Sequence, residues 1–198
     1  MSTLAPTLQA FFTDRLVRQR HASEHTIAAY RDTFKLLLAF AEQQTGSAPS
    51  QLRVADLDAP LVSAFLDHLE TVRGNGVRTR NARLAAVHSL FRYAALRHPE
   101  DSAVIQRVLA IPPKRFDRVI ITYLGEKETD ALLAAPDLST RTGRRDHAML
   151  VTAIQTGLRA SELVSLQVND IHLGSGAHVS CRGKGRYLDV SVIPMSHM

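Results

Sequence analysis

An arginine and a glutamate three residues apart, in the C-terminal half of this 198-residue chain, have the spacing to bind an anion. Arg159 follows Gly157 at the predicted start of a helix, and Glu162 lies one turn later on the same side. A buried arginine held by a glutamate in this way aims its guanidinium rigidly at a phosphate or carboxylate. On spacing alone, an ion pair at a helix N-terminus with no further role is the commoner explanation.

A second candidate is Lys184, which stands between Gly183 and Gly185 at the predicted tip of a β-hairpin. Glycines let the backbone turn sharply and let a phosphate approach closely. The spacing of a Walker phosphate-binding loop is absent, so nucleotide hydrolysis is not indicated. As a bare motif, Gly-Lys-Gly is more often a simple turn.

Residues 71–99 contain six arginines and no aspartate or glutamate. Arg78, Arg80 and Arg83 cluster at the start of a predicted helix over residues 79–97, where free N–H groups add positive charge. This arrangement suits contact with a DNA backbone or a major groove. The alternative is a solvated basic face that pairs with acids elsewhere. The 24 basic against 19 acidic residues, and the great excess of Arg over Lys, favour a polyanionic partner.

Several other classes of protein are disfavoured by composition. The nine histidines form no His-Glu-x-x-His motif, and no metal site is predicted. Cys181, in a predicted strand, is the single cysteine, which excludes an intrachain disulfide. No apolar run approaches the length of a membrane span, and the N-terminus does not resemble a secretory signal. The sequence therefore predicts a cytoplasmic protein without a cofactor.

The elements that must position these residues fall into two groups. Apolar periodicity predicts a helical domain over residues 1–110, a linker over 111–121 that contains Pro112-Pro113, and a second domain over 122–198. Within the second domain, residues 146–156 are apolar nearly all round and are predicted to be a buried helix. The predicted fold class is mainly α: four or five helices, followed by a partial α+β domain with a β-hairpin. The predicted helices cover residues 7–20, a segment capped by Ser23, 60–71, 79–97, 102–109, 126–135, 146–156 and 159–166, with strands at 178–182 and 188–192.

Three segments of the chain together resemble a known family. The run RDHAMLVTAIQTGLRASELVSLQVNDI, residues 145–171, resembles the first catalytic motif of the tyrosine recombinases, the phage-integrase family. The Gly-Lys-Gly hairpin follows at the distance usual in that family. Upstream, residues 26–31 (TIAAYR) resemble part of the family's SAM-like core-binding domain. The resemblance extends from about residue 7 to residue 186.

The resemblance implies a two-domain clamp on double-stranded DNA that needs no metal and no nucleotide. Arg159 would hold the non-bridging oxygens of the scissile phosphate, and Glu162 would brace that arginine. Lys184 would protonate the leaving 5′-oxygen. In the helical domain, the residues expected to contact DNA are Thr26, Arg31, Arg78, Arg80 and Arg83.

The chain also departs from the family pattern. In the family, a His-x-x-Arg motif and a nucleophilic tyrosine follow the hairpin, and neither follows here. Tyr187 lies three residues after Lys184 on the predicted hairpin, whereas the tyrosine of the family lies on a helix. We therefore expect a C-terminally truncated family member that binds DNA without cutting it. Its partner on DNA would be a second copy of the chain, giving a homo-oligomer, or an intact recombinase. The alternative function is that of a non-catalytic DNA-binding or helical interaction module that competes or assembles with an intact recombinase. Residues 1–110 are expected to fold alone, and the remainder to be marginally stable.

Overall fold

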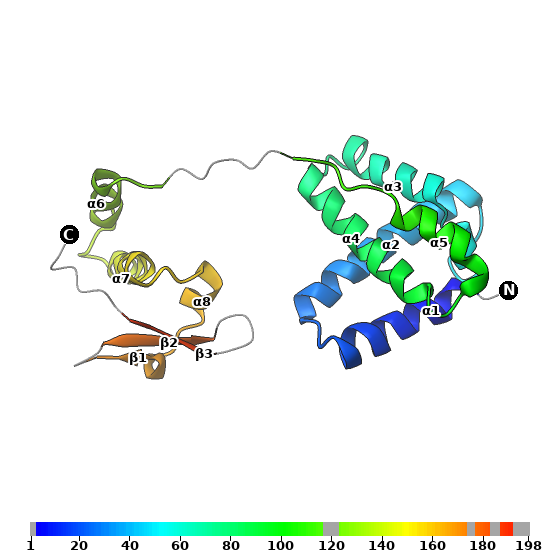
Figure 1. Ribbon diagram of the computed structural model, residues 1–198. Coiled ribbons are helices and arrows are strands. Elements are labelled where there is room, and N and C mark those ends of the chain that lie inside the picture. Colours follow the sequence, from blue (N-terminus) through cyan, green and yellow to red (C-terminus); the bar gives the residue numbers. More distant parts are fainter. Residues whose placement is uncertain (1–2, 117–122, 174–176, 183–186, 192–198) are drawn as a thin grey trace. The chain divides into compact units, whose positions relative to one another are not determined.

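The chain is divided into two units, residues 1–119 and 120–198 (Figure 1). The structure, a computed structural model, describes residues 3–116, 123–173, 177–182 and 187–191. The division between the units falls inside the linker expected at 111–121. None of the helices in the described residues is long and apolar enough to cross a membrane.

Unit 1 is built from helices, as predicted. Its elements are α1 (Leu4–Ala10), a π-helical continuation (Phe11–Gln19), α2 (Glu24–Thr45), α3 (Ala59–Thr71), α4 (Val77–Ala94) and α5 (Ser102–Leu109), with short 3-10 turns at Val54–Asp56 and Pro99–Asp101. The helix predicted at 79–97 begins two residues earlier and ends three residues earlier than expected. The other helices of this unit begin within a few residues of their predicted starts.

Side-chain caps set where two of these helices begin. The hydroxyl of Ser23 accepts a hydrogen bond from the Thr26 backbone N–H at 3.3 Å, and the Asp58 carboxylate accepts one from the Leu61 N–H at 2.9 Å. Each cap satisfies one of the four N–H groups that a helix start leaves without a partner. Pro60 stands in the first turn of α3, where its missing N–H has no cost.

The core of unit 1 is centred on aromatic side chains. Phe11 is fully buried, and its ring centroid lies 6.0 Å from that of Phe34 and 5.6 Å from that of Tyr93. These rings join the π-helical segment to α2 and α4. Around them lies a continuous cluster of buried apolar residues that runs from Leu4 to Val108. The expectation that residues 1–110 fold alone stays a prediction, and a continuous buried cluster is what it requires.

In its described residues, unit 2 has three α-helices followed by a small sheet, in line with the predicted fold class. Its elements are α6 (Glu126–Ala134), α7 (Arg141–Thr156), α8 (Ala160–Val164), a 3-10 turn (Val168–Asp170), β1 (Ile171–His172), β2 (His178–Arg182) and β3 (Tyr187–Ser191). The strands form an antiparallel sheet in the order β1-β2-β3. The predicted hairpin is β2 and β3, paired from His178 with Ser191 to Arg182 with Tyr187.

The start of α7 differs from the prediction by five residues. The helix begins at Arg141 because the Thr140 hydroxyl accepts a hydrogen bond from the Gly143 N–H at 2.9 Å. The added turn is polar, so hydrophobic periodicity could not indicate it. The helix ends at Gly157, whose φ of 65° lies in the left-handed region, as the sequence predicted.

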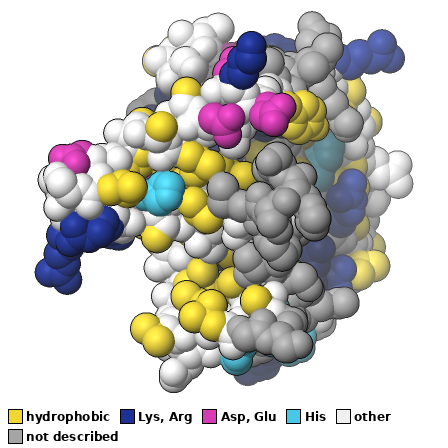
Figure 2. All heavy atoms as spheres, turned by 90° about the vertical axis from the view of Figure 1, so that its left-hand side faces the viewer, with side chains coloured by type: hydrophobic (Ala, Val, Ile, Leu, Met, Phe, Trp, Pro, Cys, Tyr) yellow, Lys and Arg dark blue, Asp and Glu magenta, His cyan; other side chains and the backbone are white. Residues whose placement is uncertain are grey.

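The prediction that residues 146–156 are buried is wrong. Within the described part of unit 2, the buried residues are Gly143 in α7 and Val179 and Cys181 in β2. The apolar side chains of α7 are half-buried at best, because no described element covers that helix on all sides. Figure 2, in which this unit faces the viewer, shows hydrophobic side chains at the surface. The large apolar residues exposed in unit 2 are Tyr123, Leu124, Leu132, Leu138, Val164, Val168, Ile171 and Leu173.

Candidate functional site

The N-terminal halves of α2 and α4 together form a groove on unit 1. The groove has a volume of about 280 Å³, and its lining residues come from these two helices alone. They are Ala29, Tyr30, Asp32 and Thr33 from α2, and Thr79, Ala82 and Arg83 from α4. The groove is thus the place where the predicted arginine cluster of α4 meets the segment of α2 that contains Thr26 and Arg31.

Arg83 is the groove residue best placed to bind a ligand. Its side chain is half-buried, and its Nη1 donates a hydrogen bond to the Thr33 hydroxyl at 3.3 Å. Thr33 is fixed in turn, because its hydroxyl donates to the Ala29 carbonyl at 2.9 Å. The Arg83 Nε is buried and has no hydrogen-bond partner among the described residues. A buried guanidinium N–H without an acceptor is rare, so the Arg83 side chain would gain from turning toward an acceptor that a ligand brings into the groove.

Three other residues predicted to contact DNA, Arg78, Arg31 and Thr26, are exposed, and the first two are next in sequence to groove residues. Arg78 is exposed in the first turn of α4, and its guanidinium carbon lies 5.4 Å from the centre of the Phe116 ring. Arg31 is exposed on α2, next in sequence to two of the groove residues. Thr26 is also exposed, but its hydroxyl lies 3.0 Å from that of Ser23 and so belongs to the cap of α2.

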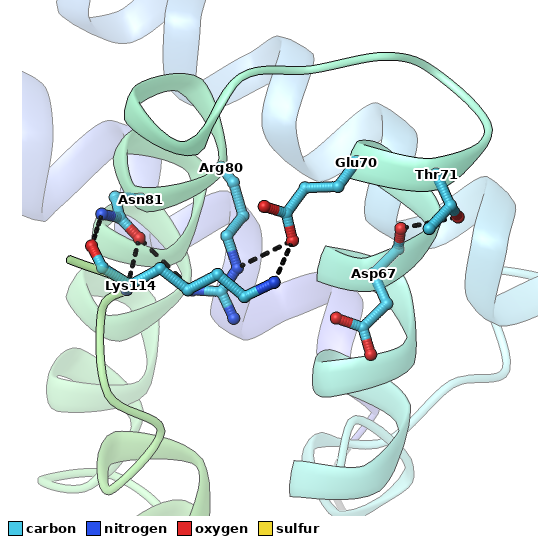
Figure 3. A network of polar contacts seen from close by, with 6 residues as sticks. All are labelled: Asp67, Glu70, Thr71, Arg80, Asn81 and Lys114. Carbon is cyan, nitrogen blue, oxygen red and sulfur yellow. Dashed lines mark hydrogen bonds and ion pairs between the residues drawn. The ribbon is translucent and has the colours of Figure 1, made fainter. Parts of the chain in front are cut away.

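Arg80 lies inside the fold instead of at the surface, which corrects its predicted role as a DNA contact. Its side chain is 7% exposed, and its Nε lies 3.6 Å from a carboxylate oxygen of Glu70 on α3 (Figure 3). Residues two apart on a helix point in nearly opposite directions, so an exposed Arg78 leaves Arg80 facing α3. Arg80 therefore stabilises the packing of α4 against α3.

In unit 2, Arg159 and Glu162 form the predicted pair at the start of α8. The Arg159 backbone N–H donates to Glu162 Oε2 at 2.9 Å, and the guanidinium Nη1 donates to Oε1 at 2.9 Å. Both hydrogen bonds lower the pKa of the Glu162 carboxyl, and the one from the Arg159 backbone N–H has the larger effect. The arginine is not buried as expected, because 76% of its side chain is exposed against 12% for the glutamate. The pair thus presents a tethered guanidinium to solvent.

Lys184 lies outside the described residues, between β2 and β3. Its predicted role as a proton donor therefore stays a prediction. The strands on either side are described, so the hairpin that the sequence predicted for Lys184 is present.

In the described residues, one group of side chains has the geometry to hold a metal ion: His98, Glu100 and Asp101. The ring nitrogens of His98 already have partners. Nε2 lies 2.7 Å from the Thr7 hydroxyl, and Nδ1 lies 3.3 Å from a Glu100 carboxylate oxygen. These contacts tie the turn after α4 to α1, which accounts for the cluster without an ion.

Sequence reasoning missed the small groove residues Thr79 and Ala82 and the α2 residue Thr33. A signal for the first two was available, because Thr79, Ala82 and Arg83 are spaced three and four apart and share one side of a helix. No local signal pointed to Thr33, since its contact with Arg83 joins residues 50 positions apart.

Two family models match the chain. The model for the phage integrase N-terminal SAM-like domain matches residues 10–98, and the model for the phage integrase family matches residues 122–197. The first match covers α2 to α4, and the second covers α6 to β3.

Relatives and solved structures agree with these models. Two predicted integrase/recombinases of Sinorhizobium fredii, y4rC and y4rD, are 57% identical over 185 residues and 43% identical over 192 residues. The chain spans 56% of the length of the first and 68% of the second, and those alignments cover 93% and 96% of this chain. Tyrosine recombinase XerD of Pseudomonas putida is 32% identical, with 88% of this chain and 55% of XerD covered.

Among solved structures, the XerH site-specific recombinase bound to its difH substrate, before cleavage, has a similar fold. Its TM-score to this chain is 0.64 at 19% sequence identity, with 94% of this chain and 54% of XerH covered. The structure of the same recombinase after cleavage gives a TM-score of 0.59 and covers 87% of this chain and 50% of XerH. With both domain models matched in order, and with y4rD similar along nearly the whole chain, this protein belongs to the phage integrase family, the tyrosine recombinases.

Proposed function

We propose that this chain binds double-stranded DNA through the α2–α4 groove, and that its 198 residues by themselves do not cut it. The observation that carries the proposal is Arg83, half-buried in a groove between two helices, with a buried Nε that lacks an acceptor. Phosphate oxygens and the edges of guanine bases are the acceptors that a planar guanidinium matches best. The XerH relative was solved bound to its difH substrate, which supports the same kind of ligand here.

Residues around the groove extend the proposed contact. Arg78, in the first turn of α4, adds positive charge where the helix N-terminus already favours an anion. Arg31 and Thr26, both exposed on the first turns of α2, are proposed to contact the DNA backbone beside it. Arg80 is left out of this set because it is buried against Glu70.

We propose that unit 2 binds a DNA phosphate, as catalytic domains of the family do, but lacks the residues needed to cleave the strand. Arg159, exposed and tethered by Glu162, would hold the non-bridging oxygens of a phosphate, and Lys184 would protonate a leaving 5′-oxygen. The 198 residues contain no His-x-x-Arg motif. The tyrosine nearest to Lys184 is Tyr187, on a β-strand. We therefore propose binding without strand cleavage.

The exposed apolar side chains of unit 2 favour a further partner for the bound state. They would be covered by a second copy of this chain or by an intact recombinase on the same DNA. The stoichiometry of DNA binding separates these arrangements from binding by a single copy.

The groove is tested by replacing its arginines and measuring binding to a labelled duplex by fluorescence anisotropy. Arg83→Ala and Arg78→Ala are each expected to weaken binding by about tenfold and to reduce the salt slope by about 1. Arg83→Lys keeps the charge but loses the planar fork, so it is expected to fall between Arg83→Ala and the wild type.

The matched control is Arg107→Ala, which removes an exposed arginine on α5 that does not line the groove. Thermal unfolding of each variant shows whether the fold is retained. Equal losses of affinity for Arg83→Ala and Arg107→Ala would mean that binding depends on overall charge and not on the groove.

A further inference from the structure

The segment after α5, residues 111–116, was predicted to be part of a linker, but the structure docks it on α4. We call this segment the strap. The side-chain amide of Asn81 pairs with both backbone groups of Lys114: its Nδ2 donates to the Lys114 carbonyl at 2.7 Å, and its Oδ1 accepts from the Lys114 N–H at 3.0 Å. An amide used in this way replaces the hydrogen bonds that a neighbouring strand would provide.

The side chain of Lys114 is held as well. Its Nζ donates to Glu70 Oε2 on α3 at 2.5 Å, and the same oxygen faces the Nε of Arg80 (Figure 3). Asn81 also accepts a hydrogen bond from Arg80 Nη1 at 3.3 Å. Through these contacts the strap, α3 and α4 form one polar network, although its members lie 33 and 44 residues apart in the sequence.

The end of the strap contacts a residue of the proposed DNA interface. The guanidinium of Arg78 lies over the Phe116 ring, 5.4 Å from its centre, which is within range of a cation–π contact. Arg78 and Asn81 are three residues apart on α4 and therefore neighbours on its surface. The strap thus follows α4 past Asn81 to Arg78.

We propose that Asn81 is a positioning residue that docks the strap so that Phe116 holds Arg78 in place for DNA. This inference rests on the proposed function. A long arginine side chain loses rotamer freedom when it binds, and a ring that restricts it beforehand reduces that loss. The docking also means that the predicted linker is held against α4 at Lys114 and Phe116.

The docking itself is tested without DNA, by amide hydrogen exchange of the full chain. The backbone N–H of Lys114 is expected to exchange at least about tenfold faster in Asn81→Ala than in the wild type, because its acceptor is removed. Pro112 and Pro113 have no N–H, so Lys114 has the first exchangeable amide after Ile111 in the strap. Alanine has a higher helix propensity than asparagine, so α4 is expected to stay folded.

Two further variants make the result specific. Asn81→Asp keeps the acceptor oxygens and loses the donation to the Lys114 carbonyl, so its exchange rate is expected to lie between those of the wild type and Asn81→Ala. Gln106→Ala, at an exposed position on α5, is expected to leave the rate unchanged. Equal rates in the wild type and Asn81→Ala would overturn the docking.

Positioning is tested by a double-mutant cycle on DNA affinity. Asn81→Ala is expected to weaken binding about threefold in the wild-type background and to have no effect in the Arg78→Ala background. Phe116→Ala should behave like Asn81→Ala, and Phe116→Tyr, which keeps the ring, should bind like the wild type. Equal losses from Asn81→Ala in both backgrounds would overturn the positioning role.

Hydrogen exchange and DNA affinity can reject the docked strap and the proposed function separately. Slow exchange at Lys114 in a chain that does not bind DNA would reject the proposed function and leave the docked strap in place. DNA binding by a chain in which Asn81→Ala changes neither exchange nor affinity would reject the strap and leave the proposed function in place.

Discussion

Replacement of Glu70 by alanine is expected to lower the free energy of unfolding of the helical unit by about 3 kcal/mol. Glu70 is the carboxylate that faces the Arg80 guanidinium, and the Arg80 side chain is only 7% exposed. Removing one partner of a buried ion pair leaves an uncompensated charge in the interior, which costs about 3–5 kcal/mol. The lower end applies because Asn81 still contacts the same guanidinium. Urea unfolding of the full chain, followed by circular dichroism, measures the change.

The matched control is Asp67→Ala, on the same helix. Asp67 is exposed, and the contact drawn for it in Figure 3 uses its backbone carbonyl, which accepts from the Thr71 hydroxyl. Its replacement is expected to change stability by no more than about 0.5 kcal/mol. Combining Glu70→Ala with Arg80→Met removes both charges and should recover much of the loss. A double variant as unstable as Glu70→Ala alone would show that the buried charge is not the cause.

Limited trypsin digestion of the full chain is expected to remove unit 2 at least about ten times faster than it cuts unit 1. The buried apolar cluster of unit 1 runs from Leu4 to Val108, whereas in the described part of unit 2 the buried side chains are Val179 and Cys181. Proteolysis follows the population of locally open states, and few buried contacts mean frequent opening. Exposed trypsin sites lie in or near the helices of unit 2, at Lys127, Arg141, Arg144, Arg145 and Arg159.

Mass spectrometry of the digest identifies the surviving fragment, which should retain α1 to α5. The same digestion in the presence of duplex DNA is a useful comparison, because a ligand that binds the native state slows opening. Survival of a fragment that begins near residue 123 for as long as the N-terminal fragment would contradict the expected difference in stability.

The helices of unit 1 could be predicted from sequence because their signals are local. Ser23 and Asp58 cap α2 and α3 as their residue types indicate, and Pro60 stands in the first turn. The predicted burial of residues 146–156 failed for a different reason. A helix that is apolar all round needs neighbours on every side, and hydrophobicity alone does not say whether the chain supplies them.

The candidate site was predicted in part. Of the predicted site residues, Arg78 lies at the surface and Arg83 lines the groove. The helical period of 3.6 residues places Arg80 on the opposite side of α4 from Arg78, and the prediction for Arg80 did not take that period into account. The hydrogen bonds of Asn81 with Lys114 and the ion pair of Glu70 with Arg80 could not be predicted. They depend on tertiary packing that brings together residues far apart in the sequence.

Whether these 198 residues bind DNA without cutting it is tested by a titration followed by a trap for covalent adducts. The full chain is titrated onto a nicked duplex at two salt concentrations, and the mixture is then denatured to reveal covalent protein–DNA adducts. Tight, salt-sensitive binding and no adduct are expected. A covalent adduct would contradict this expectation, because one of the chain's four tyrosines, with Tyr187 the first to examine, would then act as a nucleophile.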